Sequence, residues 1–191
     1  VMVIIHGGGM IAGSGEYNFA LAPMLNAEGI VLVTINYRLG SLGFFAHPQL
    51  DGSQGVNFGL MDMLASLRWI NRNIAAFGGD PKQVTITGVS AGAMAVNMLM
   101  ANPASADLIA GGIAQSGYGT WPLQPRTEHV TPLKNAPSAE SIALQLASQA
   151  TGKPSHKLKR KDLYAVTAAQ WTSTVRGFHL PIIDGISQIE E

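Results

Sequence analysis

The 191-residue sequence contains no cysteine and has few charged residues. Without cysteine, a disulfide framework and a metal site built on thiolates are both excluded. Asp, Glu, Lys and Arg make up 13% of the residues, whereas about 25% is typical of soluble domains. The 12 basic residues balance the 12 acidic ones. This balance gives no electrostatic basis for binding nucleic acid or an anionic membrane.

Long apolar runs are also missing. The longest uncharged ones, such as residues 30–35, are far too short to span a bilayer, and no signal peptide is visible. Apolar residues nevertheless make up 47% of the chain. A small free-standing domain needs more polar surface than this, so we expect the chain to be the inner part of a larger protein. The sequence indicates neither a compartment nor an oligomeric state.

A Gly-x-Ser-x-Gly pattern occupies residues 88–92, between two segments of different character. Residues 84–87 are β-branched and predict a short buried strand, whereas residues 93–100 are rich in Ala, Met and Leu and predict a helix. A strand, a sharp turn and a helix form the setting in which this pattern exposes a nucleophilic serine, here Ser90. The bare pattern is a weak signal, and a Gly-Ser turn before an ordinary helix is the simpler alternative.

Three consecutive glycines, residues 7–9, follow an apolar run that is typical of a strand covered on both faces. Glycines let backbone N–H groups approach a ligand closely, although a flexible loop is the simpler alternative. The spacing Gly7-x-Gly9-x-x-Ala12 also fits a dinucleotide-binding fingerprint. Two features oppose that interpretation. The next strand ends at Asn36, where an acidic ribose ligand is expected, and two further glycines interrupt the helix that would receive the pyrophosphate.

The remaining patterns predict alternating strands and helices up to about residue 118. We expect strands at 1–5, 30–35, 84–87 and 108–115, with helices at 17–28, 57–77 and 93–100. This order gives an α/β fold with a mostly parallel sheet and helices on both faces. Ligands bind beyond the carboxyl ends of such strands, so the three glycines and Ser90 share one rim.

The pattern weakens from residue 119 onward, where several prolines indicate a loop. Residues 138–150 predict a helix that Ser138 caps and Gly152 ends. Thr167 and Gln170 have the form of a capping box and predict another short helix. A run of four basic residues between 157 and 161 is interpreted as a solvated helix start.

Together, eight stretches now point to a family. They are His6–Gly9, Asn36–Gly40, Asn57–Asp62, Trp69–Ile70 with Asn73–Ile74, Phe77–Pro81, Gly88–Gly92, Gln115–Gly117 and Pro181–Gly185. In their content and order the sequence resembles the type B carboxylesterase and lipase family, which has the α/β-hydrolase fold and includes the cholinesterases. The likeness covers most of residues 1–118 and only scattered positions beyond.

The resemblance implies a serine hydrolase that acts on carboxylic esters through an acyl-enzyme. It implies Ser90 as the nucleophile and an oxyanion hole made by the backbone N–H groups of Gly8, Gly9 and Ala91. The expected partner is a small-molecule ester, with no nucleic acid, no membrane span, no organic cofactor and no metal ion. We expect one partial α/β-hydrolase domain over residues 1–191. Its core strands and nucleophile turn lie in about 1–118, and a loop and helical segment in about 119–191.

The sequence departs from the family in two ways. Val89 stands before the nucleophile, where the family usually has Glu. The family's acid and base follow the serine well beyond the segment 181–185, so we expect the triad to be incomplete and the isolated chain to be inactive. The pairs Asp107 with His129 and Asp162 with His179 keep the right order but do not follow a recognisable late strand. A non-catalytic binding or adhesion member of the same fold is the alternative, which the retained Ser90 opposes.

Overall fold

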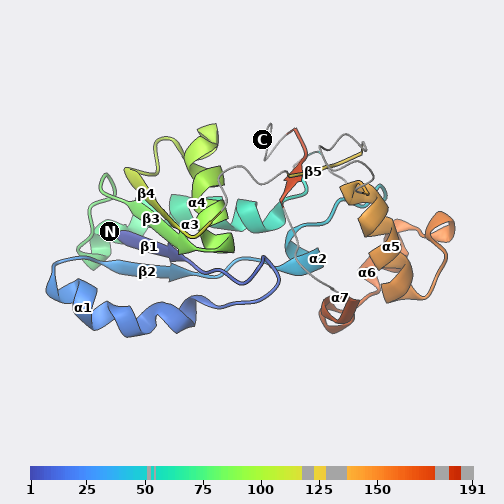
Figure 1. Cartoon of the computed structure of the whole chain (residues 1–191), viewed down its shortest axis with the longest axis horizontal. Helices are drawn as coiled ribbons and strands as arrows, with labels where there is room; N and C mark the ends of the chain where they lie inside the picture. The colour runs from blue at the N-terminus through green and yellow to red at the C-terminus, as the bar shows by residue number, and fades with distance from the viewer. Residues whose placement is uncertain (51–52, 54, 118–122, 128–136, 175–180, 186–191) are drawn as a thin grey trace. The chain divides into compact units, whose positions relative to one another are not determined.

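The computed structural model describes residues 1–50, 53, 55–117, 123–127, 137–174 and 181–185 (Figure 1). The chain forms two compact units. The first unit combines Val1–Tyr37 with Leu60–Thr120, and the second combines Arg38–Gly59 with Trp121–Glu191. None of the helices within these described residues is long and apolar enough to cross a bilayer.

The first unit is built on a four-stranded parallel sheet with the strand order β2-β1-β3-β4. Its strands are β1 (Met2–Ile5), β2 (Leu32–Ile35), β3 (Thr85–Val89) and β4 (Gly111–Gln115). Ile5 pairs with Ile35 on one side and with Gly88 on the other. The residues that follow β1 and β3 therefore meet at one rim of the sheet, as the strand pattern predicts.

Helices cover both faces of this sheet, as expected for the fold class. Residues 15–27 form a 3-10 helix, η1 (Gly15–Leu21), followed by a short α1 (Ala22–Ala27), and both pack against β2 (Figure 1). The sequence predicts one continuous helix here, which is wrong. Pro23 has no N–H to donate to the preceding turn, so the α-helix starts anew beside it.

The long helix predicted at 57–77 is α3 (Phe58–Asn73), which continues as the 3-10 helix η2 (Ile74–Phe77). Gly78 ends it in the left-handed conformation, with φ 81°. Apolar residues recur every three or four positions along this helix, a spacing that predicts one buried face. The positions from Leu60 to Ile74 are buried accordingly, but Phe77, which continues the same spacing, is 62% exposed. The tighter 3-10 turn changes the direction of its side chain, which lies beside the ring of Trp69 instead.

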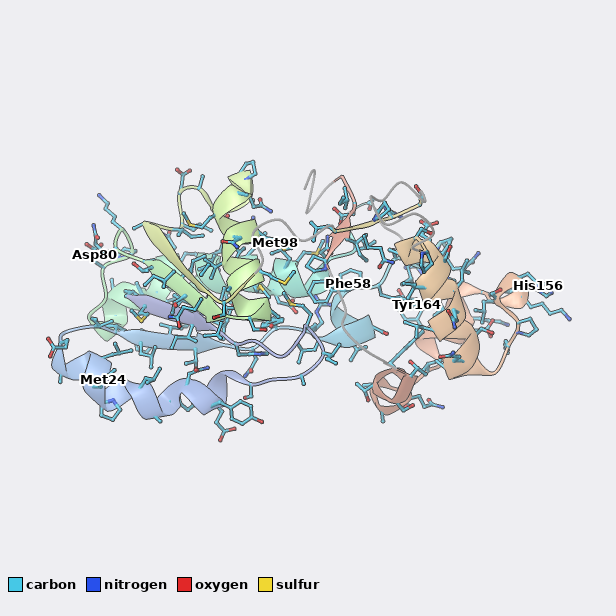
Figure 2. The ribbon with its side chains drawn as sticks, in the orientation of Figure 1. Met24, Phe58, Asp80, Met98, His156 and Tyr164 are labelled. Carbon is cyan, nitrogen blue, oxygen red and sulfur yellow. The ribbon has the colours of Figure 1, made fainter. Side chains whose placement is uncertain are left out.

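Helix α4 (Ala91–Ala101) follows the serine turn and packs against β1, β3 and β4. Eight of its eleven residues are buried, which explains why small and flexible apolar residues fill it. A short 3-10 helix, η3 (Pro103–Ser105), leads from α4 towards β4. Figure 2 labels the buried Met98 on α4 and the exposed Met24 on α1.

The second unit is mostly helical. Its elements are α2 (Gly40–Gly43), α5 (Ala139–Thr151), the 3-10 helix η4 (Ser155–Lys157), α6 (Arg160–Tyr164), α7 (Ala168–Thr174) and a parallel pair of two-residue strands, β5 (Gln124–Pro125) and β6 (Ile182–Ile183). An apolar cluster joins α5, α6 and α7 through Phe45, Ala143, Ala147, Leu158, Leu163 and Trp171.

The predicted helix ends of this unit are confirmed. The Ser138 hydroxyl accepts a hydrogen bond from the Ser141 N–H at 3.2 Å, and Gly152 ends α5 with φ 68°. At α7 the Thr167 N–H donates to Gln170 Oε1 at 2.9 Å, and the Gln170 N–H donates to Thr167 Oγ1 at 3.3 Å. This exchange is the capping box that the sequence predicts.

Asn57 fixes the segment 181–185 in the second unit. Its side-chain amide donates to the Ile182 carbonyl and accepts from the Ile182 N–H, both at 2.7 Å, and the residue is fully buried. The Asp184 carboxylate accepts from the Val56 N–H at 2.8 Å. The side-chain amide of Asn57 therefore pairs with the backbone of Ile182 as the backbone of a neighbouring strand would. This pairing links two of the family-like stretches, Asn57–Asp62 and Pro181–Gly185, in the structure.

His47 is a buried histidine in the second unit. It is 2% exposed, stacks on Phe45 and accepts a hydrogen bond from the Gln49 N–H at Nδ1, at 3.1 Å. The proton of the neutral ring is therefore on Nε2, which has no partner within the described residues. Burial lowers the pKa of His47, and the charge of Glu140 partly opposes this shift.

We predict that His47 weakens the fold in mild acid. The unfolded chain takes up a proton on this ring as the pH falls through about 6.5, whereas the folded ring resists protonation until a lower pH. The unfolded state then binds more protons, so the free energy of unfolding falls below pH 6.5, by at most about 1.4 kcal/mol per pH unit. Urea denaturation at pH 7.5, 6.5 and 5.5, followed by tryptophan fluorescence, measures the slope.

The matched control is His47→Asn, which keeps a side-chain acceptor for the Gln49 N–H but does not titrate. The difference in unfolding free energy between wild type and His47→Asn should shrink or reverse as the pH falls. A difference that stays constant from pH 7.5 to 5.5 would contradict a neutral buried ring.

Candidate active site

Ser90 lies in a strained turn between β3 and α4. Its φ is 56° and its ψ is −120°, a conformation that costs a non-glycine residue about 1–3 kcal/mol. Two hydrogen bonds hold the turn, because the Ser90 N–H donates to the Gln115 carbonyl at 2.9 Å and the Ser90 carbonyl accepts from the Met94 N–H at 3.1 Å. The sharp turn that the sequence pattern predicts at Ser90 is confirmed.

The two glycines of the pattern are required by close backbone packing. A Cβ on Gly88 would lie 2.4 Å from the backbone of Gly92, and a Cβ on Gly92 would lie 2.1 Å from the Ile5 carbonyl oxygen. Both distances are far shorter than any real contact of a carbon side chain. The turn and α4 can therefore press against the end of β1 only because these side chains are absent.

The glycine loop after β1 lies against the Ser90 turn. A Cβ on Gly7 would lie 2.6 Å from the Val89 carbonyl oxygen and 3.4 Å from Ser90 Cβ. Gly8 and Gly9 have φ values of 109° and 64°, in the region that favours glycine. The expectation that the glycine loop and Ser90 share one rim is confirmed. The alternative of a flexible loop is not supported, because the loop packs against the Ser90 turn.

His6 and Tyr37 pack together at the start of the glycine loop and hold it in place. The two rings stack with their centroids 4.4 Å apart, and the Tyr37 hydroxyl donates to the His6 carbonyl at 2.8 Å. His6 Nδ1 lies 2.8 Å from the Gly7 carbonyl oxygen, which can only accept, so the proton of the neutral ring is on Nδ1. Burial raises the pKa of Tyr37 well above its usual range, which keeps its hydroxyl a donor. Sequence reasoning assigned no role to Tyr37.

The Ser90 side chain is exposed, and its hydroxyl has no hydrogen-bond partner within the described part of the chain. His129 and His179 lie outside the described residues. Asp162 binds Lys153 Nζ at 2.6 Å and the Lys159 N–H at 2.9 Å at the start of α6. These contacts lower the pKa of Asp162, the hydrogen bond to Lys153 most of all. Its carboxylate therefore caps the N-terminus of α6.

A hollow of about 460 Å³ opens beside the glycine loop and the residue before Ser90. Gly7, Gly8, Val89 and Tyr17 are among the residues that line it. The described residues contain no group of three His, Asp or Glu side chains that could hold a metal ion.

The structure of the glycine loop does not support the alternative of a dinucleotide-binding site. The loop is followed by the 3-10 helix η1 and not by an α-helix that opens on the glycines. The Asn36 side chain, at the position where an acidic ribose ligand would stand, accepts from the Gly15 N–H at 3.0 Å. Asn36 therefore binds the first residue of η1, and Ser14 is the N-cap of that helix.

A parallel sheet whose strand runs through a strained serine into a buried helix, with a glycine loop beside that serine, defines an α/β hydrolase. The chain belongs to the carboxylesterase family, whose model matches residues 1–187.

Known proteins agree with this assignment. The chain is 44% identical over 132 residues to fumonisin B1 esterase of Sphingopyxis macrogoltabida, covering 67% of this chain and 24% of that protein. It is 45% identical over 118 residues to neuroligin-2 of Mus musculus, covering 61% of this chain and 14% of that protein. A solved structure of a PNB esterase matches with a TM-score of 0.79 and 33% identity, covering 99% of this chain and 40% of that one. The chain thus spans about a quarter of the length of the esterase relative.

We predict that Tyr37→Phe destabilises the first unit. The variant keeps the ring that stacks on His6 and removes only the hydroxyl, which leaves the His6 carbonyl without its donor. An unsatisfied buried acceptor costs about 1–3 kcal/mol, measured as the change in the free energy of unfolding in urea. The control is Tyr17→Phe, because Tyr17 is 79% exposed and should change stability by less than about 0.5 kcal/mol. Equal losses in the free energy of unfolding for Tyr37→Phe and Tyr17→Phe would contradict this role of the Tyr37 hydroxyl.

Proposed function

We propose that this chain carries the nucleophile and the oxyanion hole of a serine hydrolase that cleaves carboxylic esters. Membership of the carboxylesterase family supports ester hydrolysis. The observation that carries the residue roles is the contact between the glycine loop and the Ser90 turn, where a Cβ on Gly7 would lie 2.6 Å from the Val89 carbonyl oxygen. That contact puts the glycine loop beside the exposed serine, which supports the assignment of backbone N–H groups of this loop to the oxyanion hole.

In the proposed reaction, Ser90 Oγ attacks the ester carbonyl carbon and its proton passes to a base. The carbonyl oxygen becomes an oxyanion that accepts hydrogen bonds from the N–H groups of Gly8, Gly9 and Ala91. One such donor is worth about 3–4 kcal/mol in known serine hydrolases. The alcohol leaves with a proton, an acyl-enzyme remains on Ser90, and water then hydrolyses it. These steps need no organic cofactor and no metal ion.

The base and acid of the triad belong, in this proposal, to residues after the segment 181–185, as in the family. Support comes from the site itself, since no imidazole within the described residues bonds the Ser90 hydroxyl. A serine without a base is a poor nucleophile. The 191-residue chain alone would therefore hydrolyse esters far below an enzyme-like rate.

A non-catalytic binding member of the same fold is the second candidate. One observation favours it. Mouse neuroligin-2, which is 45% identical to this chain over 118 residues, is not named as an esterase. The retained Ser90 opposes it. A binding protein has no need of a serine held at φ 56° with an exposed hydroxyl.

We predict that a fluorophosphonate probe labels Ser90 slowly and selectively, and that p-nitrophenyl butyrate turnover is weak. The remaining oxyanion hole and binding leave a rate about 10³–10⁴ above that of water when the base is lost. Peptide mass spectrometry locates the label, and absorbance follows turnover. Ser90→Ala should abolish the labelling, whereas the weak turnover should change little, because the oxyanion hole and substrate binding remain.

Ser116→Ala is the matched control, because Ser116 is also an exposed serine with a positive φ, 54°, at a strand end. It should leave labelling unchanged. Label on Ser116 in place of Ser90, or equal label on both, would refute the nucleophile. Fast turnover that Ser90→Ala and also His129→Ala or His179→Ala abolish would refute the proposed position of the base.

A further inference from the structure

Met10 follows directly after the glycine loop and has an unusual backbone. Its φ is 60°, a left-handed value that a side chain of this size rarely adopts. Gly9 before it has a φ of 64°, and the Gly8 carbonyl accepts a hydrogen bond from the Ile11 N–H at 3.1 Å. Two positive φ values within such a hydrogen bond are typical of a type I′ turn, in which glycine and asparagine are favoured at the position that Met10 occupies.

The Met10 side chain is buried, whereas the residues around it are not. It is 1% exposed and is one of the largest fully buried side chains among the described residues. Gly8, Ile11 and Ala12 on either side are exposed, and Gly9 is half-buried. The turn therefore sends a single large side chain into the interior from an otherwise exposed stretch.

The strain at Met10 shows what holds this turn. A glycine would meet no penalty at φ 60°. Methionine is strained there, and such strain persists only where the surrounding packing outweighs it. The flexible side chain of methionine fits an irregular gap in a core, and its removal from water is the favourable contribution that offsets the strain. The buried side chain therefore holds the turn against the preference of its own backbone.

The glycine loop needs an anchor of this kind. Glycines have the greatest backbone freedom, so three in a row, residues 7–9, do not fix the direction of their own N–H groups. At its start the loop is held by His6, which is 6% exposed and stacks on Tyr37. Met10 is the buried residue at its other end. An oxyanion hole must be fixed before charge develops on the substrate, and a buried side chain on each side of the glycines meets this requirement.

We propose that Met10 is a positioning residue, whose buried side chain fixes the turn of the glycine loop and thereby the N–H groups of Gly8 and Gly9. It touches no substrate and acts only through the backbone. The inference rests on the proposed function for the role of those two N–H groups in the oxyanion hole. The anchoring itself concerns only the turn from Gly8 to Ile11 and is tested separately.

The test compares Met10→Ala with Met63→Ala in the 191-residue chain. Met63 is also a methionine that is 1% exposed, but it lies on α3. Both substitutions should lower the urea concentration at the midpoint of unfolding, because both leave a cavity. In buffer without urea, only Met10→Ala should slow the labelling of Ser90 by the fluorophosphonate probe, by about tenfold or more, because it displaces two donors to the phosphonyl oxygen. Met10→Leu keeps an apolar side chain of similar volume and should restore labelling to nearly the wild-type rate.

Met10→Gly tests the strain, and it takes the place of Met10→Ala if that variant does not fold. Glycine adopts φ 60° freely, whereas alanine does not. Met10→Gly should therefore unfold at a higher urea concentration than Met10→Ala, the reverse of the usual order of these two residues. It should still be labelled slowly, because it has no side chain to bury.

Amide hydrogen exchange follows the turn without any chemistry at the serine. The Ile11 and Ala12 N–H groups both donate to the Gly8 carbonyl, each at 3.1 Å. We expect the wild type to protect these two amides from exchange although both residues are exposed. Met10→Ala and Met10→Gly should lose the protection, whereas Met63→Ala should keep it.

Three results would overturn the inference: labelling of Met10→Ala or Met10→Gly at the wild-type rate, equal slowing of labelling by Met63→Ala, or no protection of the Ile11 and Ala12 amides in the wild type. A failure of the proposed function looks different. In that case the probe does not label Ser90 in the wild type, while the Met10 variants still lose the amide protection.

Discussion

The structure of the first unit depends on one close approach, in which the end of β1 meets the turn between β3 and α4. Three missing side chains allow it, because a Cβ at Gly7 would lie 2.6 Å from the Val89 carbonyl oxygen, and a Cβ at Gly88 or Gly92 would lie 2.9 or 2.1 Å from the Ile5 carbonyl oxygen. That approach packs α4 onto the sheet and brings the glycine loop beside Ser90. The strain at Ser90 persists because the packing around it fixes the turn.

The proposed chemistry follows from this packing. A fixed loop of backbone N–H groups costs no reorganisation when charge develops on the substrate, which is what an oxyanion hole requires. The stacked rings of His6 and Tyr37 hold the loop through the His6 carbonyl and the Gly7 carbonyl. The hollow that Val89 and the glycine loop line in part lies at the same strand ends.

Much of this could be predicted from the sequence, because strands and helices leave periodic patterns and the serine turn has a fixed context. The break at Pro23 and the exposure of Phe77 were missed, since each depends on a local switch to 3-10 geometry that apolar spacing does not reveal. The bonds of Tyr37 to His6 and of Asn57 to Ile182 were missed for another reason. They join residues 31 and 125 positions apart, and a single sequence carries no signal for such pairs.

The central claim is that the N–H groups of Gly8, Gly9 and Ala91 converge on one oxygen of a group bound to Ser90. The most direct measurement is a crystal structure of the chain after phosphonylation of Ser90, with the phosphonyl oxygen as a stand-in for the oxyanion. The account predicts that this oxygen lies about 2.7–3.1 Å from the three backbone nitrogen atoms. A phosphonyl oxygen that points into solvent, with the glycine loop turned away from it, would contradict the account.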